Sequence, residues 1–370
     1  MAALVVDPEA LAALVAARAP VAAAATDPRN RFWQALLAAE LSPAKSRTLL
    51  QEFGLLLDVE RLKKHSLLTD AERRRVEAVS WRAFEDALAH DAVFLEESDY
   101  PEALQEAGNQ SPVLSVRGDV GALHAPCIAL VGTRSASTYG KACAYKFSEA
   151  LARAGVTVLS GGAVGIDAAA HRGALDAGGR TAAVLAGGND HVYPSVHAGL
   201  FREITARGCL VSQYALGTKP NDYKFPARNQ LIAALSVAVL VIEAPHKSGA
   251  LITAHVANDL GRPVFVVPGN IDLENFAGSN SLIRDGATLV SYPAQILDEL
   301  GIELAAPVAE AEPETEAGQK ILRVLSTQAT TVEKIGELTG LPAAEILGEL
   351  TMLELDGRIF RDAGGYALKR

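Results

Sequence analysis

The sequence predicts an α/β protein whose core is a parallel, doubly wound sheet, with a small all-helical module before it and a winged helix after it. Two observations predict the core: short apolar stretches alternate with helical stretches, and several of the apolar stretches end in glycine. Strands that are buried on both faces form such nearly continuous apolar runs. The seven predicted strands are CIALVG, VTVLSGG, TAAVLAGG, CLVSQY, VAVLVIEA, PVFVVPG and ATLVSY.

The N-terminal part of the chain is predicted to be helical over residues 27–92. Three helical stretches follow one another, RFWQALLAAEL, SPAKSRTLLQEFG and TDAERRRVEAVSWRAFEDALAHD, and Ser42 with Pro43 is a typical helix start. Residues 1–26 are alanine-rich but carry acidic residues and no basic n-region. We therefore expect a flexible leader there and not a signal peptide.

The core domain is predicted over residues 93–304, beginning with the short strands and turns of VFLEESDYPEALQEAGNQSPVLSVRGD. Residues 305–317 contain four glutamates and no basic residue, which is typical of a solvated linker. Residues 318–370 show three helical patterns and then RIFRDAGGYALKR, a predicted hairpin with Gly364 and Gly365 at its turn. This order indicates a winged helix.

The charge of the chain is unevenly distributed. The net charge is −10, which argues against a protein that coats nucleic acid over its whole surface. Residues 125–295, however, carry 14 basic and 11 acidic residues, whereas the rest of the chain carries 20 and 33. The three cysteines are far apart and form no metal-binding pattern, and no uncharged run is long enough for a membrane helix. We expect a reducing, cytoplasmic setting and neither a metal nor a cofactor.

Two loops that follow predicted strands have the composition of anion sites. Gly132-Thr133-Arg134 offers backbone N–H groups at a helix start beside a guanidinium. Ser160, Gly161 and Gly162 repeat the pattern after the next strand, although glycines in such turns also serve packing alone. The dinucleotide fingerprint G-x-G-x-x-G and the Walker A motif are both absent.

A third stretch adds cations and an aromatic side chain around one apolar strand. Lys224 and the cations near it are expected to bind successive phosphates of a nucleic acid while Phe225 stacks on a base. A core aromatic ahead of Pro226 is the alternative for Phe225. Glu243 is interpreted as a structural carboxylate that pairs with Arg228 or Lys247. The polar and aromatic residues of this stretch are Lys224, Phe225, Arg228, Asn229, Lys247, Ser248, Gly249 and Arg262.

Catalysis has little support in the sequence. Asp167 and His171 lie four positions apart on a predicted helix and share a face, so an acid–base pair is one interpretation. An aspartate at a helix start more often binds free backbone N–H groups, which is the alternative. No nucleophile elbow or paired-carboxylate signature accompanies them, and we predict no catalytic residue.

The motifs VGTR, SGGAVGIDAAAH, GTKPNDYKFPARNQLIAALS, VIEAPHKSGALITA, GRPVFVVPGN and GSNSLIRDGA occur in this order. With them the chain closely resembles the DNA-processing protein A (DprA/Smf) family of bacteria, most strongly over Val93 to Leu300. The resemblance implies a sterile-alpha-motif-like (SAM-like) helical domain, an extended Rossmann-like domain and a winged helix. It also implies a non-enzymatic homodimer, joined through the Rossmann domain, that binds and protects single-stranded DNA and loads a RecA-type recombinase in natural transformation.

The resemblance also implies a set of DNA contacts. This chain departs from the family pattern at three positions: Gln230 stands where an arginine is usual, Ser279 for a threonine and Ala250 for a serine. Gln230 removes one cation, so it is expected to weaken DNA binding or to shift the contact to Lys224. The implied contacts are Gly132, Arg134, Ser160, Gly161, Gly162, Phe225, Arg228, Asn229, Lys247, Ser248, Gly249, Gly278, Ser279 and Asn280.

Two other functions are open on the sequence. One is a Rossmann-type nucleotide-processing enzyme of the phosphoribohydrolase kind, but the stretch from Val267 to Asn270 lacks the second glycine and the threonine of that motif. The other is a duplex-DNA regulator that acts through the winged helix. Its third predicted helix, AAEILGELTMLELDG, carries four acidic residues and no basic one, which suits a major groove poorly.

Overall fold

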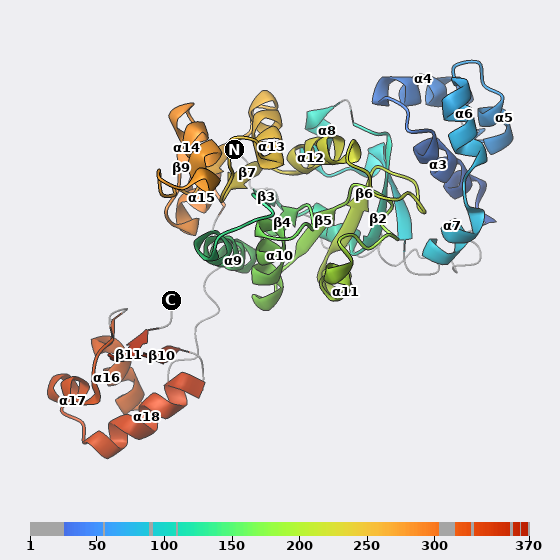
Figure 1. Ribbon diagram of the computed structural model, residues 1–370. Coiled ribbons are helices and arrows are strands. Elements are labelled where there is room, and N and C mark those ends of the chain that lie inside the picture. The colour runs from blue at the N-terminus through green and yellow to red at the C-terminus, as the bar shows by residue number, and fades with distance from the viewer. Residues whose placement is uncertain are drawn as a thin grey trace. The chain divides into compact units, whose positions relative to one another are not determined.

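The computed structural model describes residues 26–302 apart from 55, 89–91 and 109, and residues 315–368 apart from 327–328, 356–357 and 363. The chain divides into two compact units, Met1–Leu304 and Ala305–Arg370 (Figure 1). Almost all of the leader expected over residues 1–26, and most of the linker expected over 305–317, lies outside the described residues.

The larger unit is built on a sheet of nine strands among the described residues, in the order β1-β2-β6-β5-β4-β3-β7-β8-β9. The strands from β6 to β9 in this order are parallel, and β1 and β2 are antiparallel additions at one edge. The seven strands predicted from apolar runs all form, as β3 to β9. The bounds are β1 Ala92–Glu96, β2 Val113–Gly118, β3 Cys127–Val131, β4 Thr157–Ser160, β5 Thr181–Val184, β6 Cys209–Ser212, β7 Ala238–Val241, β8 Val264–Val266 and β9 Thr288–Leu289.

The order of the strands creates a switch point between β3 and β7. From β3 the chain adds β4, β5 and β6 on one side, and then crosses back to place β7, β8 and β9 on the other side of β3. The connections that leave β3 and β7 therefore diverge at the carboxyl edge of the sheet. A crevice opens at such a point in doubly wound folds, and ligands bind there.

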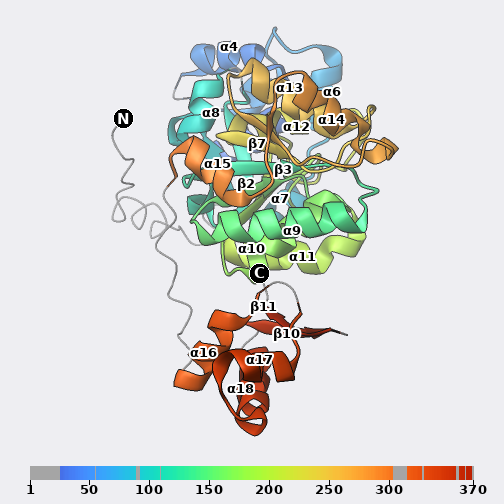
Figure 2. The same cartoon turned by 90° about the vertical axis from the view of Figure 1, so that its left-hand side faces the viewer.

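Helices cover both faces of the sheet (Figures 1 and 2). Alternate residues of β3 face opposite layers: Ile128 and Leu130 pack in the cluster that holds α9, α10 and α15, and Ala129 and Val131 in the cluster that holds α8, α12, α13 and α14. The helices are α8 Glu102–Ala107, α9 Thr138–Arg153, α10 Ile166–Asp176, α11 Ala198–Arg207, α12 Lys224–Leu235, α13 Gly249–Asp259, α14 Ala277–Arg284 and α15 Pro293–Leu300, with short 3-10 turns η1 Glu97–Asp99, η2 Val120–Leu123, η3 Ser195–His197 and η4 Glu274–Phe276.

The N-terminal part is helical, as predicted, with one difference. Ser42 accepts a hydrogen bond from the Lys45 N–H at the start of α4, which confirms the predicted start. The third predicted helix is divided in two, because Ser80 begins a new helix, with its carbonyl accepting from the Phe84 N–H. The helices are α3 Pro28–Ala39, α4 Pro43–Phe53, α5 Val59–Lys63, α6 Asp70–Glu77 and α7 Trp81–Leu88.

The helical part is joined to the sheet by buried polar and apolar contacts. The fully buried Gln34 of α3 donates from Nε2 to the Leu216 carbonyl at 2.9 Å and accepts from the Leu216 N–H at 3.0 Å. Ala215 and Leu216 also pack in the apolar clusters of the helical part. Both polar ends of Gln34 are thus satisfied only when the two parts are docked.

The smaller unit has the predicted winged-helix elements. Helices α16 Glu316–Val324, α17 Val332–Thr339 and α18 Ala343–Leu355 pack with a hairpin of β10 Ile359–Asp362 and β11 Gly365–Leu368. Ile321, Ile335, Ile346 and Leu350 are fully buried between them and form the core of this unit. The hairpin turn lies between Asp362 and Gly365, so it contains Gly364 as predicted, whereas Gly365 begins β11.

Candidate functional site

A hollow of about 290 Å³ opens at the switch point, between the loops that leave β3 and β7. It is bounded by three loops at the carboxyl edge of the sheet and by one face of α12. Eight of the predicted site residues line it: Gly132, Arg134, Phe225, Arg228, Asn229, Lys247, Ser248 and Gly249. The structure therefore brings together residues that are more than one hundred positions apart in the sequence.

The loop after β3 is fixed by close backbone packing. The Thr133 N–H donates to the Glu243 carbonyl at 2.7 Å. A Cβ atom on Gly132 would lie 2.5 Å from Ile166 Cγ1 and 2.9 Å from the same Glu243 carbonyl, so only glycine fits there. Arg134 follows directly, and its side chain is exposed at the rim of the hollow.

The prediction that Glu243 pairs with Arg228 or Lys247 is wrong. The fully buried Glu243 carboxylate accepts from the Ser137 N–H, from Ser137 Oγ at 2.7 Å and from Asn275 Nδ2 at 2.7 Å. Ser137 is the N-cap of α9, so the carboxylate lies at the positive end of that helix. Glu243 thus holds the loop that carries Arg134 and leaves the cations of the hollow without a carboxylate from this side.

The glycine loop after β4 is held from both sides. Asp167 Oδ2 accepts from the Gly161 N–H at 3.1 Å and from the Ala163 N–H at 3.2 Å. Arg228 Nη1 donates to the Gly161 carbonyl and, at 2.9 Å, to the Val184 carbonyl. Burial raises the pKa of Asp167, and the positive charge of Arg228 and the N–H donors act against that rise. Asp167 therefore holds the glycine loop in place.

His171 does not form the acid–base pair with Asp167 that was one interpretation of their spacing. The Thr181 hydroxyl donates to the Val158 carbonyl, so His171 Nδ1 donates to Thr181 Oγ1, at 2.7 Å. The imidazole is fully buried, and burial lowers its pKa to about 3. His171 is thus a neutral core residue near neutral pH.

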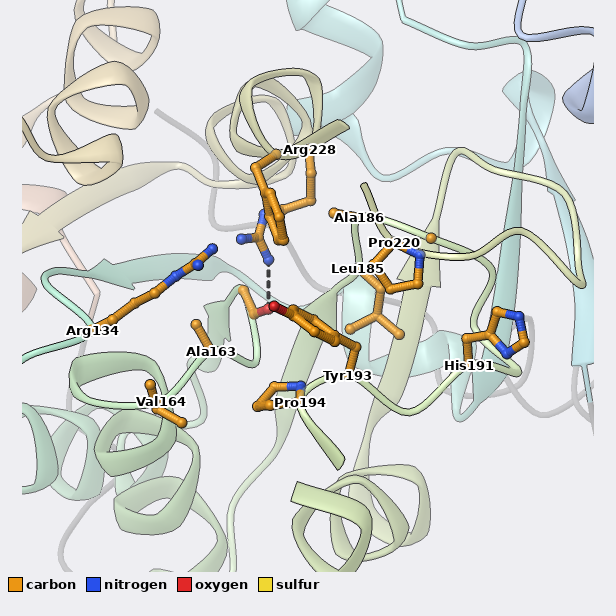
Figure 3. Close-up of a pocket in the computed structure, with 13 residues that line it drawn as sticks. Arg134, Ala163, Val164, Leu185, Ala186, His191, Tyr193, Pro194, Pro220 and Arg228 are labelled. Atoms are coloured by element: carbon orange, nitrogen blue, oxygen red, sulfur yellow. Dashed lines mark hydrogen bonds between the residues drawn. The ribbon is translucent and has the colours of Figure 1, made fainter. Parts of the chain in front are cut away.

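Arg134 and Arg228 both line the hollow. Figure 3 shows them among the residues of a smaller hollow beside it. Arg134 lies with its Cζ 4.7 Å from the centroid of the Phe225 ring, and Arg228 with its Cζ 5.6 Å from the same centroid. Burial lowers the pKa of Arg228, the negative charge of Asp167 acts against that fall, and the like charge of Arg134 adds to it. Asp167 thus offsets part of the positive charge of Arg228, whereas the exposed Arg134 is available to an anion at the rim of the hollow.

A second, smaller hollow of about 70 Å³ adjoins the first and shares Arg134, Phe225 and Arg228 with it. Its other wall is formed by Tyr193 and Pro194 from the loop after β5. The half-exposed Tyr193 ring lies 6.2 Å from the Phe225 ring, at an interplanar angle of 44°. Tyr193 was not predicted from the sequence, although TAAVLAGG ends in glycines like the two strands whose loops were predicted to bind an anion.

The loop after β7 presents the start of α13 to the hollow. Ser248 is the N-cap of α13 and accepts from the Ala250 N–H at 3.2 Å. Asn229 bridges this loop to α12, since its Nδ2 donates to the Gly249 carbonyl at 3.0 Å and its Oδ1 accepts from Arg228 Nε at 3.0 Å. The exposed Lys247 then adds a cation beside the positive end of the α13 dipole.

Other predicted site residues lie behind the hollow and support it. Ser160 is buried and donates to the Leu130 carbonyl at 2.6 Å, and Gly162 has a positive φ of 68° and packs on Phe201. The buried Gly278 and Ser279 donate their N–H groups to the Ala244 carbonyl and so support the start of the Lys247 loop. None of these four residues lines the hollow.

Three further polar residues of these motifs point elsewhere. Asn280 exchanges hydrogen bonds with the backbone of Gly269, and Gln230 is exposed on α12 outside the lining of the hollow. Arg262, which was grouped with the cations around the central strand, donates to carbonyls at the end of α12, among them Ala234 at 2.7 Å. It therefore caps that helix end.

Lys224 is also placed differently from the prediction. Its side chain is 3% exposed and forms an ion pair with Glu40 of the helical part, and it lines neither hollow. Within residues 26–302 and 315–368 as described, no three metal-binding side chains come together, and no helix has both the length and the apolarity of a membrane span.

The fold and the site together define a class: a doubly wound α/β protein with a cationic hollow, lined by aromatic side chains, at its topological switch point. The model of the DNA recombination-mediator protein A family matches residues 91–301, and that of the DprA winged helix domain matches residues 305–365. The chain belongs to the DNA recombination-mediator protein A family.

Individual relatives agree with this membership. The chain is 37% identical to Protein Smf of Escherichia coli over 76% of its own length and 78% of that protein. It is similar to the X-ray structure of DNA processing protein A from Streptococcus pneumoniae, with a TM-score of 0.63, 30% identity, and 73% of this chain and 97% of that chain covered. A structure of DNA processing protein A from Helicobacter pylori, which concerns that protein's single-stranded DNA binding mode, matches with a TM-score of 0.52 and 29% identity over 56% of this chain and 95% of that one.

Proposed function

We propose that this chain binds single-stranded DNA in the hollow between β3 and β7. The observation that carries the proposal is that two exposed cations, Arg134 and Lys247, face the same hollow as the Phe225 ring. A strand of unpaired nucleotides presents both phosphates and the flat faces of its bases. Cations beside an aromatic ring suit that combination and bind it with little dependence on sequence.

The two hollows favour a division of contacts. Phosphates bind to Arg134 and Lys247 beside the start of α13, where the helix dipole adds to the positive potential. A base enters the smaller hollow and stacks on Phe225 or Tyr193. The bonds of Arg228 to Gly161 and Val184 keep the wall between the two hollows in place.

We further propose that the protein protects incoming single strands and loads a RecA-type recombinase onto them, as a homodimer joined through its α/β domain. Membership of a recombination-mediator family supports this role. The test is the rate at which a RecA-type recombinase displaces single-strand-binding protein from DNA, with and without this protein. Equal rates would argue against the loading role and would leave DNA binding itself to be tested separately.

The test of DNA binding is a titration of oligonucleotides, single-stranded against double-stranded, at two ionic strengths. The proposal predicts tighter binding of the single strand and a loss of affinity at the higher salt. A protein that prefers duplex DNA, or that binds neither, would contradict it. Incubation with nucleoside monophosphates is the matching test for an enzyme, because release of free base would identify a phosphoribohydrolase.

A further inference from the structure

Lys224, the first residue of α12, lies in a closed environment at the border with the helical part. Its ammonium forms an ion pair with Glu40, and it lies 4.3 Å from the centroid of the Tyr214 ring and 5.3 Å from that of Tyr223. The lysine is 3% exposed, and the glutamate is 21% exposed. With a carboxylate and two aromatic rings around it, this ammonium has no free side for a phosphate.

The backbone of Glu40 is strained in order to place that carboxylate. Glu40 ends α3 with φ 51° and ψ 49°, a left-handed conformation, and among the described residues it is the one residue other than glycine with a positive φ. Glycine usually occupies this position at a helix end because it has no Cβ atom. A glycine there would relieve the strain but would leave Lys224 without a partner. Strain that persists at such a position indicates that the side chain is needed.

A negative charge from outside the helix stabilises the start of α12. No side chain caps its first turn and no acidic residue lies in that turn, so Lys224 places a cation at the positive end of the helix dipole. Glu40 compensates both positive charges. Phe225 is the next residue, and Arg228 lies one helical turn beyond Lys224 on the same side of the helix. The position of Lys224 therefore determines where these two site residues lie.

We propose that Glu40 is a positioning residue for the single-stranded DNA site: through Lys224 it fixes the start of α12 and thereby the residues of α12 that line the hollow. The helical domain then sets the affinity of a site whose lining includes none of its residues. This inference rests on the proposed function. It replaces the expectation that Lys224 contacts DNA.

The variant Glu40→Gln distinguishes a positioning role from a direct charge effect on DNA, because the two predict opposite changes in DNA affinity. Removal of an acidic group near a site for a polyanion should strengthen DNA binding, and a released Lys224 that bound a phosphate would steepen the salt slope by about 0.7. Positioning predicts that affinity falls, by roughly twofold to thirtyfold, with the slope unchanged. Tighter binding with a steeper slope would overturn the proposal.

A matched control exists in the same domain. Lys45 and Glu72 form an ion pair at 2.5 Å and line neither hollow, so Glu72→Gln changes the net charge equally and should leave affinity unchanged. Lys224→Met should repeat the effect of Glu40→Gln with the slope again unchanged. The exchanged pair Glu40→Lys with Lys224→Glu should recover part of the affinity, which a direct phosphate contact by Lys224 would not allow.

Hydrogen exchange tests, in the absence of DNA, whether the ion pair of Glu40 with Lys224 fixes the start of α12. Amides in the first two turns of α12 should exchange faster in Glu40→Gln and in Lys224→Met than in the wild type, and Glu72→Gln should leave them unaltered. Unaltered exchange in Glu40→Gln and Lys224→Met would overturn the proposal. If the wild type bound no single-stranded DNA, the proposed function would fall, and this measurement would still decide whether Glu40 fixes α12.

Discussion

The salt dependence of DNA binding can be worked out from the exposed cations of the hollow. Each phosphate that is neutralised on a single strand contributes about 0.7 to the slope of log affinity against log salt. Arg134 and Lys247 are exposed there, whereas Arg228 is 5% exposed and its Nη1 is bonded to two carbonyls. The two exposed cations give a slope of about −1.4, or a sevenfold loss of affinity for a fourfold rise in salt.

Arg134→Ala or Lys247→Ala should therefore lower the slope to about −0.7, and the double variant to near zero. Arg134→Lys is the control: it keeps the charge and the slope but loses the planar guanidinium over Phe225, so affinity alone should fall. The assay is fluorescence anisotropy with a labelled oligonucleotide of about ten nucleotides, a length that confines contacts to one site. A slope that is the same in Arg134→Ala as in the wild type would refute the assignment of the hollow.

Three further predictions follow from packing and titration. Gly161→Ala places a Cβ atom 2.2 Å from Arg228 Nη1, so it should lower the free energy of unfolding in urea by about 1–3 kcal/mol and weaken DNA binding. Gly199→Ala is the control, because its Cβ atom meets nothing within 4 Å and should change neither quantity. The pKa of His171 is about 3 in the folded protein against 6.5 when exposed, so the unfolded chain binds a proton at a higher pH than the folded one and the free energy of unfolding should fall as the pH falls below 6.5. His171→Asn should show a smaller fall of this free energy, and a fall equal to that of the wild type would contradict this account. Deletion of the chain after Glu316 should leave single-strand affinity nearly unchanged, and a complete loss would show that the winged helix takes part in binding.

Much of the fold could be predicted because its signals are local. The runs around β3 to β9 are apolar on both faces, and each strand ends near a turn residue, so their number and parallel direction follow from the sequence. The division between α6 and α7 was missed because the helical pattern continues through Ser80, whose role as a helix start shows only in the backbone. The ends of elements are decided by such single contacts.

The candidate site was less predictable, because residues of one type have different partners. Lys224, Arg228, Lys247 and Arg262 are all cations around one strand, and the sequence groups them together. Lys224 is paired with a glutamate 184 positions away, and Arg262 binds carbonyls at the end of a helix. Those partners come from other elements, so only the folded chain distinguishes a cation that supports the site from one that faces the ligand.

The small number of exposed cations has a consequence for long strands. Two phosphate contacts in one hollow give limited affinity, so a strand held at a single hollow should dissociate readily. In the proposed homodimer, a strand long enough to reach the second hollow binds there at a high effective concentration. We therefore expect the affinity per nucleotide to rise steeply above a threshold length, and Arg134→Ala to remove this rise because it weakens both hollows. An affinity that grows only in proportion to the number of binding registers on the strand would show that each hollow acts alone.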